Sequence, residues 1–327
     1  MDNKFYDCAI IGGGLAGLTL SVQLAYAGYS VVLFEQEKYP FHKVCGEYIS
    51  MESFGFLERI GILLSSMNLP RINEVKVSSP DGTSFTRKLS MGGFGISRYT
   101  LDSTLAALAV KKGVTLLEET KVQDASFSND GFTVTITGQT YKAKTVFGAY
   151  GKKGTLDRVL NRKFKEHKNY VGIKYHIQTD LPANRIELHN FKGGYCGISK
   201  VDGDKYCMCY LTDSQNLLDN ENSIKQMELK VLMKNPFLAK YFSEAVFLTK
   251  PIVVSQITFH KKSAVENHIL MLGDAAGSIA PLCGNGISMA MNASYRAFIL
   301  ADQFLKGNIA RDKFEQEYTQ QWNAVRK

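Results

Sequence analysis

The sequence predicts an α/β fold: a parallel sheet covered by helices, with an antiparallel sheet inserted into it. Three observations predict this arrangement. A glycine-rich βαβ unit covers residues 5–35, alternating apolar and polar residues dominate 170–211, and a second glycine-rich segment covers 268–294. Such alternation is typical of strands that are buried on one face only. The middle of the chain is therefore expected to form a different sheet from the two ends.

The first unit has the glycine spacing GxGxxG at Gly12, Gly14 and Gly17. Gly12 allows a tight turn, Gly14 lets the backbone approach a pyrophosphate, and Gly17 lets a helix pack closely on the strand. The helix predicted over 15–27 offers its N-terminal N–H groups to the phosphates. The unit therefore predicts a Rossmann-like dinucleotide site.

Glu35 follows the second strand of this unit, which is predicted over 31–34. At this position a carboxylate accepts hydrogen bonds from an adenosine ribose, whereas an arginine would favour a 2′-phosphate. The ligand is therefore expected to be NAD or FAD and not NADP. The βαβ unit alone leaves NAD and FAD open.

The segment after Glu35 is predicted to form a loop and then short elements. Pro40 and Gly46 discourage regular structure in the loop, and Asp-Gly at the turn 80–82 favours a hairpin. The expected elements are a helix within 50–63, hairpin strands 74–79 and 84–89, a strand 92–97, a helix 100–112, a parallel strand 114–118, and a second hairpin of 132–137 and 140–147.

The inserted sheet is predicted from the alternating stretches that follow. Its expected strands are 170–178, 185–191, 195–201, 206–211, 245–248 and 253–259, with a helix over 223–233. The expected nucleotide-binding domain comprises 1–70, 95–151 and 263–327, and the expected substrate-binding sheet domain comprises 71–94 and 152–262.

The second glycine-rich segment returns the chain to the nucleotide site. A buried strand is predicted over 269–272, Gly273 lets the chain turn, and Asp274 presents a carboxylate where a polyol hydroxyl could lie. Gly284 and Gly286 shape a loop before a helix, whose first N–H groups would face a ligand. Asp274 as a simple helix N-cap is the alternative.

Composition limits the remaining classes of protein. The chain has 327 residues, a net charge of +8 and six cysteines without zinc-type spacing, so we expect reduced thiols and no metal site. The charge suits an anionic substrate or a membrane surface as well as nucleic acid. Because the sequence contains no bilayer-length apolar run and no signal peptide, we expect a cytoplasmic protein.

The motifs together resemble the FAD-dependent family of aromatic hydroxylases and geranylgeranyl reductases, the group A flavoprotein monooxygenase-like proteins. The resemblance rests on GxGxxG with Glu35, on Arg98 followed by Leu101 and Asp102, and on the Gly-Asp-Ala motif with its glycine loop. The stretch KVCGEYIS, residues 43–50, is most similar to the reductase branch, which has Cys-Gly near the flavin.

This resemblance implies FAD as the cofactor. The ADP half is expected at the GxGxxG loop and Glu35, the pyrophosphate and ribityl region at Arg98, the ribityl chain at Asp274, and the isoalloxazine at 284–287. The residues expected to bind the cofactor are Gly12, Gly14, Leu15, Ala16, Gly17, Glu35, Gln36, Lys43, Arg98, Val122, Gly273, Asp274, Gly284, Gly286 and Ile287.

The sequence departs from the family at two places. Ala149, Tyr150 and Gly151 stand where the hydroxylases have an Asp-Gly motif, which puts reduction by NADPH in the hydroxylase manner in doubt. The single tryptophan, Trp322, lies near the C-terminus, which argues against the tryptophan-rich motif of the flavin halogenases.

The catalytic candidates come from the loop of the Cys-Gly motif: Cys45 as a thiol near the substrate or a proton donor, Glu47 as a weaker proton donor, and Tyr48. Tyr195, Tyr210 and 281–283 are further pocket candidates, whereas Cys207 and Cys209 are expected to be core residues.

Three functions follow as hypotheses. The first is hydride transfer to an unsaturated, largely apolar substrate such as an isoprenoid or polyene. The second is hydroxylation or epoxidation of a small or carrier-bound substrate, and the third is flavin binding without turnover. The expected partner is an apolar or anionic small molecule and not nucleic acid. The basic segment 152–168 leaves a peripheral membrane or carrier-protein contact open.

Overall fold

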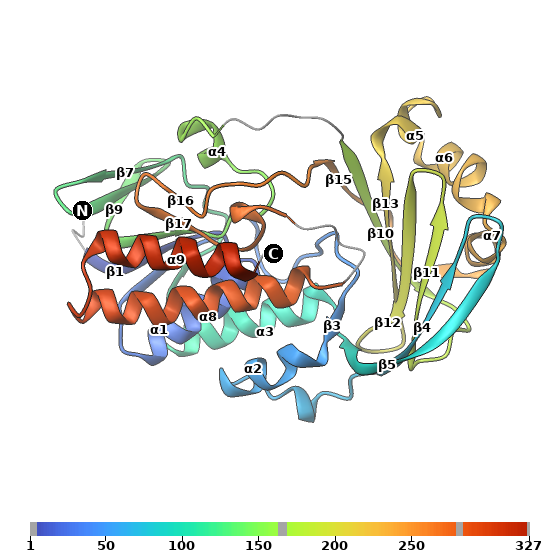
Figure 1. The fold of residues 1–327 in the computed structure, drawn as a ribbon, viewed down its shortest axis with the longest axis horizontal. Helices are drawn as coiled ribbons and strands as arrows, with labels where there is room; N and C mark the ends of the chain where they lie inside the picture. The colour runs from blue at the N-terminus through green and yellow to red at the C-terminus, as the bar shows by residue number, and fades with distance from the viewer. Residues whose placement is uncertain (1–4, 163–168, 279–283, 326–327) are drawn as a thin grey trace.

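The structure is a computed structural model that describes residues 5–162, 169–278 and 284–325. A helix-covered sheet forms one end of the elongated molecule and a second sheet forms the other (Figure 1). Both chain ends belong to the first part, so the second sheet is an insertion between them. The mixed α/β architecture with a parallel and an antiparallel sheet is confirmed.

The first sheet has a parallel core that starts from the GxGxxG strand. β1 pairs in parallel with β2 and β9, and β17 and β6 extend the parallel arrangement on either side. β7 and β8 form an antiparallel extension. The strands are β1 (Phe5–Ile11), β2 (Val31–Phe34), β6 (Thr115–Leu117), β7 (Asp124–Ser128), β8 (Gly131–Ile136), β9 (Gln139–Gly148), β16 (Val265–Glu266) and β17 (Ile269–Met271).

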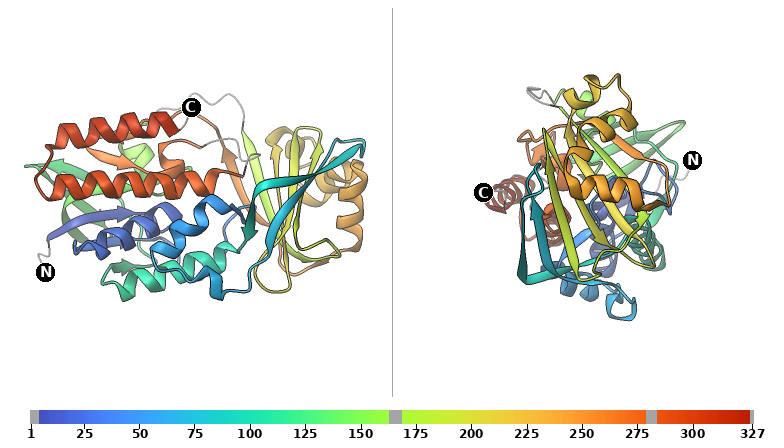
Figure 2. Two further views of the ribbon diagram at one scale, coloured as in Figure 1. Left: turned by 60° about the horizontal axis from the view of Figure 1, so that its bottom comes forward. Right: turned by 90° about the vertical axis from the view of Figure 1, so that its right-hand side faces the viewer.

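Four long helices cover this sheet: α1 (Leu15–Tyr26), α3 (Arg98–Lys111), α8 (Gly286–Leu305) and α9 (Arg311–Val325). The first and the last parts of the chain meet where α1 packs against α8 (Figure 2). Within this contact the buried hydroxyls of Thr19 and Ser294 are hydrogen bonded at 2.7 Å. The two glycine-rich segments therefore lie on adjacent elements, although more than 250 residues separate them.

The second sheet is antiparallel except for the β4–β11 pair, which is parallel. Its strands are β3 (Tyr48–Ser50), β4 (Arg71–Ser78), β5 (Ser84–Gly95), β10 (Tyr170–Gln178), β11 (Arg185–Phe191), β12 (Gly194–Lys200), β13 (Tyr206–Asp213), β14 (Val246–Phe247) and β15 (Ile252–Ile257).

The helices α5 (Ser214–Leu218), α6 (Ile224–Lys230) and α7 (Pro236–Glu244) lie on the outer face of this sheet (Figure 1). A separate core forms beneath them, in which Tyr175 and Tyr210 donate to the Glu228 carboxylate at 2.8 and 2.6 Å. Tyr210 is 1% exposed and belongs to this outer core. Its prediction as a pocket residue is therefore wrong, because the strand alternation turns it away from the nucleotide-binding part.

The short helices complete the description: α2 (Phe54–Arg59), α4 (Thr155–Val159), η1 (Met51–Ser53), η2 (Leu64–Ser66), η3 (Leu232–Lys234) and η4 (Gly273–Ala276). The predicted strand 92–97 is not separate, because β5 runs without a break to Gly95. The sequence reading missed β7, α5 and α7, which are short or weakly patterned. None of the described helices has the length and apolarity needed to span a bilayer.

Candidate functional site

The GxGxxG loop is packed too closely for side chains at two of its glycines. A Cβ added at Gly12 would lie 2.5 Å from the carbonyl oxygen of Ala149, and one at Gly17 would lie 2.0 Å from the carbonyl oxygen of Gly12. The helix α1 therefore starts in direct contact with the turn after β1. Leu15 and Ala16, in its first turn, are buried.

Two cations face the middle glycine of the loop. A Cβ added at Gly14 would lie 3.9 Å from Lys43 Nζ and 4.0 Å from Arg98 Nη2. Asp102 holds both cations, Arg98 through a bidentate pair at 2.7 and 2.8 Å and Lys43 at 3.2 Å. Burial disfavours the charged form of Arg98. The interactions of its guanidinium with Asp102 and with Cys45 are stronger than this effect, and they raise the pKa of Arg98 above its ordinary value.

Glu35 lies beside the same loop. Its carboxylate is 7% exposed and accepts from the backbone N–H groups of Gly13 at 2.7 Å and Glu37 at 3.1 Å. These bonds fix the turn after β2 against the glycine loop. Gln36 is exposed next to it, and Val122 is buried in the core. Contacts of these residues with a ribose or an adenine remain predictions.

The second glycine-rich segment approaches the first as predicted. A Cβ on Gly273 would be 3.6 Å from Ala16 Cβ, so the turn after β17 lies against α1. Asp274 follows with a side chain that is 40% exposed and pairs with Lys152 at 3.6 Å. Asp274 lies inside η4, whose N-cap is Leu272, so the N-cap alternative does not describe it.

The glycine loop of this segment packs against Tyr48. A Cβ on Gly284 would lie 3.3 Å from Tyr48 Cδ1. Gly286 begins α8, and Ile287 is buried in its first turn. The candidates at 281–283 lie outside the described residues. The early loop and the late glycine loop thus meet, which the sequence suggested only through the resemblance.

Glu47 lies at the joint between the two parts of the molecule. Its carboxylate is fully buried and accepts from the backbone N–H of Arg98 at 2.7 Å, from His176 Nε2 at 2.7 Å and from Lys174 Nζ. Burial favours the neutral acid, but the bonds from His176 and Lys174 outweigh it and lower the pKa of Glu47. Glu47 is therefore an ionised, buried link between the early loop and β10, and its proposed part as a weaker proton donor stays a prediction.

Cys207 also belongs to this cluster. Its sulfur, a Glu47 oxygen and a His176 nitrogen lie within 4.8 Å of one another, a set that could hold a metal ion and that spacing along the chain does not reveal. The Lys174 ammonium already binds the Glu47 carboxylate and would repel a cation. We therefore interpret the cluster as an ion-pair network.

Three thiols lie near this joint and differ in their surroundings. Burial raises the pKa of Cys209 to about 12 and that of Cys207 well above its ordinary value. Cys207 donates to the carbonyl of Cys45 at 3.2 Å. Cys45 itself is partly exposed, and its sulfur accepts from the Glu47 N–H at 3.4 Å beside the Arg98 guanidinium. Cys207 is buried, whereas Cys45 and Cys209 are partly exposed.

The inner face of the second sheet carries apolar side chains that are only half buried. Register places Lys174 and His176 opposite Cys209 and Cys207, so these residues share the face that meets the joint. The apolar residues on the same face are Val75, Val77, Ile186, Leu188, Tyr195 and Leu211. The outer face, by contrast, is covered by helices. The inner face is therefore the surface on which an apolar molecule could lie.

A family model described as an FAD binding domain matches residues 6–326. The chain belongs to this FAD-binding family. FAD is its cofactor, and it is an FAD-dependent enzyme of the oxidoreductase class. The glycine cradle, the cations at Gly14 and the exposed Asp274 carboxylate fit the pyrophosphate and the polyol of that cofactor.

Two curated relatives are similar over most of the chain. A digeranylgeranylglycerophospholipid reductase of Methanococcus vannielii is 23% identical over 97% of this chain and 82% of its own length. Conditioned medium factor receptor 1 of Dictyostelium discoideum is 24% identical over 90% of this chain, which spans 62% of that receptor.

Solved structures share the fold. The myxobacterial chondrochloren halogenase CndH superposes with a TM-score of 0.82 at 18% identity, over 98% of this chain and 79% of the halogenase. PqsL of Pseudomonas aeruginosa, a probable FAD-dependent monooxygenase, gives 0.78 at 16% identity, over 98% and 93%.

Proposed function

We propose that this enzyme reduces a carbon–carbon double bond of a largely apolar substrate, such as an isoprenoid or polyene. The observation that carries the proposal is the half-buried apolar inner face of the second sheet, which meets the loop of Cys45 and Tyr48. An apolar chain gains free energy by covering such a face, about 25 cal/mol for each Å² removed from water.

FAD, when bound, supplies hydride-transfer chemistry. In our proposal the glycine loop, Lys43 and Arg98 hold the pyrophosphate, Glu35 the ribose, and Asp274 the ribityl chain. Gly284 to Ile287 border the ring, because the loop that contains them packs against Tyr48. Ion pairing with Asp102 fixes the two cations before the cofactor arrives.

Cys45 is the proposed acid. Reduction of a double bond adds a hydride to one carbon and a proton to the other, and the Cys45 thiol gives that proton. The thiolate left behind is stabilised by the Glu47 N–H and by the Arg98 guanidinium. Glu47 acts as a positioning residue, because its bonds fix the loop against β10.

The reductase of Methanococcus vannielii supports this proposal by similarity over nearly the whole chain. The name of that reductase describes a lipid with isoprenoid chains, which would suit the apolar inner face. A peripheral membrane contact would follow from such a substrate, and it is part of the proposal.

A second candidate is oxygen insertion, because the solved neighbours with this fold include a probable monooxygenase. A third is flavin binding without turnover, because a receptor is among the relatives. Both alternatives predict a different fate for an unsaturated substrate.

The deciding experiment incubates the FAD-loaded enzyme with a chemical reductant and a geranylgeranyl lipid, with and without ¹⁸O-labelled oxygen. Mass spectrometry is expected to find a gain of two hydrogens per double bond and no label. Labelled oxygen in the product would overturn the reductase proposal. If no product forms either with or without oxygen, flavin binding without turnover is favoured. Cys45→Ser is expected to lower the rate of reduction about 100-fold while FAD stays bound.

A further inference from the structure

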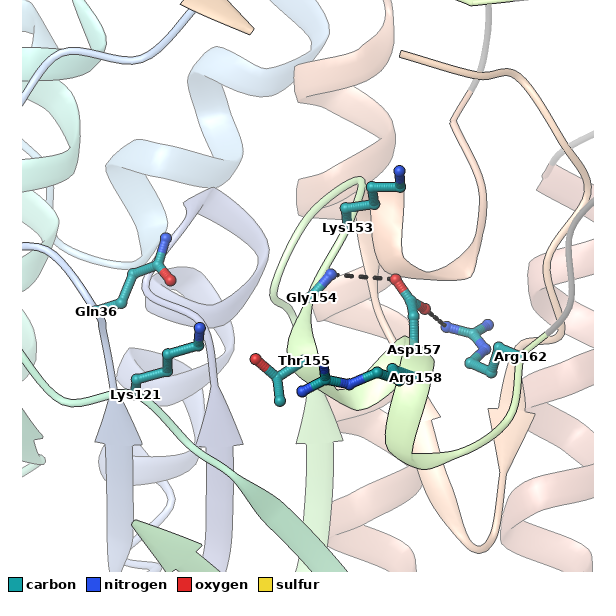
Figure 3. A pocket seen from close by; sticks show the side chains of 8 residues that line it. All are labelled: Gln36, Lys121, Lys153, Gly154, Thr155, Asp157, Arg158 and Arg162. Atoms are coloured by element: carbon teal, nitrogen blue, oxygen red, sulfur yellow. Dashed lines mark hydrogen bonds and ion pairs between the residues drawn. The ribbon is translucent and has the colours of Figure 1, made fainter. Parts of the chain in front are cut away.

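Two cavities adjoin the cofactor-binding part of the molecule. The first has a volume of about 480 Å³ and is lined by residues that follow β2, β6 and β9 (Figure 3). These strands run parallel to β1, so this cavity lies at the same edge of the sheet as the glycine loop and belongs to the dinucleotide site. The second, of about 570 Å³, is lined by Thr100 of α3, by 67–70, by Ala183 and by the turn 200–203. It lies where the inserted sheet meets α3.

Asp202 connects that turn to the start of α3. Its carboxylate accepts from the backbone N–H of Ser97, from the Ser97 hydroxyl at 3.2 Å and from the Thr100 hydroxyl at 2.8 Å. Lys205 of the same turn pairs with this carboxylate at 3.2 Å. Ser97 is buried and is the N-cap residue of α3. A residue of the inserted sheet therefore holds the first turn of a helix that belongs to the cofactor-binding part.

The start of α3 carries N–H groups that cannot find partners within the helix. Asp202 accepts from the N–H of Ser97, and Glu47 accepts from the next N–H, that of Arg98, at 2.7 Å. Burial disfavours the charged form of Asp202. The hydrogen bonds from Ser97 and Thr100 are stronger than this effect, and they lower the pKa of Asp202 below its ordinary value. Two carboxylates from outside the helix thus lie at the positive end of its dipole.

The helix that Asp202 holds is the one that presents Arg98. Arg98 is the first residue of α3, and its Nη2 lies 4.0 Å from the position of a Cβ on Gly14. A shift of the first turn would move this guanidinium relative to the glycine loop. We propose that Asp202 is a positioning residue for the cofactor, which holds α3 so that Arg98 faces the FAD pyrophosphate. The inference goes beyond the proposed function, since it rests on FAD as the cofactor and not on which substrate is reduced.

The contact also makes FAD binding and the docking of the inserted sheet depend on each other. If the turn that contains Asp202 strengthens FAD binding, then FAD must stabilise the docked turn by the same factor, because coupling free energies are reciprocal. This turn joins β12 to β13, two central strands of the second sheet. The inserted sheet is therefore more firmly docked when FAD is bound.

The test measures the release of FAD from the loaded protein, from the rise in flavin fluorescence after dilution. The test variant is Asp202→Asn, which keeps the shape of the side chain and removes its charge. The control variant is Asp204→Asn on the same turn, because the Asp204 side chain is 87% exposed and pairs with Lys200 at 3.4 Å. We expect Asp202→Asn to release FAD about tenfold faster, the size of losing one charge-assisted hydrogen bond, and Asp204→Asn to release it like the wild type.

A second comparison separates positioning from a general loss of stability. Arg98→Gln removes the group through which Asp202 acts, so adding Asp202→Asn to that variant should change the rate of FAD release less than about twofold. A merely structural role would give the same acceleration with and without Arg98. Thr100→Val removes one bond to Asp202 and should speed release about threefold, and it replaces Asp202→Asn in both comparisons if that variant does not fold.

Hydrogen exchange measures the reciprocal effect. The backbone amides of 201–205 should exchange more slowly in the FAD-bound wild type than in the FAD-free protein, and Asp202→Asn should lose this difference. The proposal is overturned if the test variant releases FAD at the wild-type rate, or if Asp204→Asn accelerates release equally. It is also overturned if the acceleration is the same with and without Arg98.

Discussion

The glycine cradle, Gly12 to Gly17, and the joint around Glu47 are held together in different ways. In the cradle the backbone makes the contacts, and Gly12 and Gly17 are required because a Cβ would overlap with carbonyl oxygens. At the joint, buried charged side chains from β10 and from the early loop make the contacts. The cradle therefore depends on the absence of side chains, whereas the joint depends on their pairing.

The largest expected effect breaks the joint. Glu47→Gln leaves the Lys174 ammonium buried without a counter-charge, which costs about 3–5 kcal/mol of unfolding free energy. Urea denaturation of the FAD-loaded protein measures this loss. The double variant Glu47→Gln with Lys174→Met should recover most of it, since neither buried charge then remains. If the double variant is as unstable as the single one, the ion pair is not what holds the two parts together.

The next effect breaks the cradle. Gly17→Ala places a Cβ 2.0 Å from the Gly12 carbonyl oxygen, so α1 must move away from the turn. We expect a loss of about 1–3 kcal/mol and release of FAD, measured by flavin absorbance after gel filtration. Gly131→Ala is the matched control, because its added Cβ would meet only an ordinary contact at 3.5 Å in β8. Retention of FAD by Gly17→Ala would contradict the role given to this contact.

These two sites also differ in how much the sequence predicts of them. Glycine spacing is local, so the cradle, its helix and Glu35 were predicted from residues 5–35 alone. The joint has no local signal, because its partners lie about 130 residues apart in a loop and a strand. Strand alternation is enough to place Lys174 and His176 on one face of a strand. It does not tell which acid of the early loop contacts them. Strand alternation predicted the inserted sheet, yet it could not say which face is covered, so Tyr210 was placed on the wrong side.

A smaller expected effect is a difference between the two sites in how the unfolding free energy depends on pH. The pKa of Glu47 is lowered in the folded protein. The contribution of this carboxylate to the unfolding free energy is fully present above its unfolded pKa of about 4.3. It is lost as the pH falls through the lower pKa of the folded protein. The difference in unfolding free energy between wild type and Glu47→Gln should shrink over that acidic range. Gly17→Ala has no such titration, so its difference from wild type should stay constant while the protein remains folded.

The smallest expected effect concerns the apolar inner face, which adjoins the joint without taking part in it. Leu188 is half buried there and packs 3.4 Å from the position of a Cβ on Gly197. Leu188→Ala removes contact area for an apolar substrate, so the KM should rise about fivefold, equivalent to about 1 kcal/mol, with kcat nearly unchanged.

Met208→Ala is the control, because Met208 is fully buried on the outer face. That change should lower stability by about 2–5 kcal/mol and leave KM unaltered. If both variants change KM alike, the substrate does not lie on the inner face, and the apolar residues there serve only to pack the sheet against the loop of Cys45.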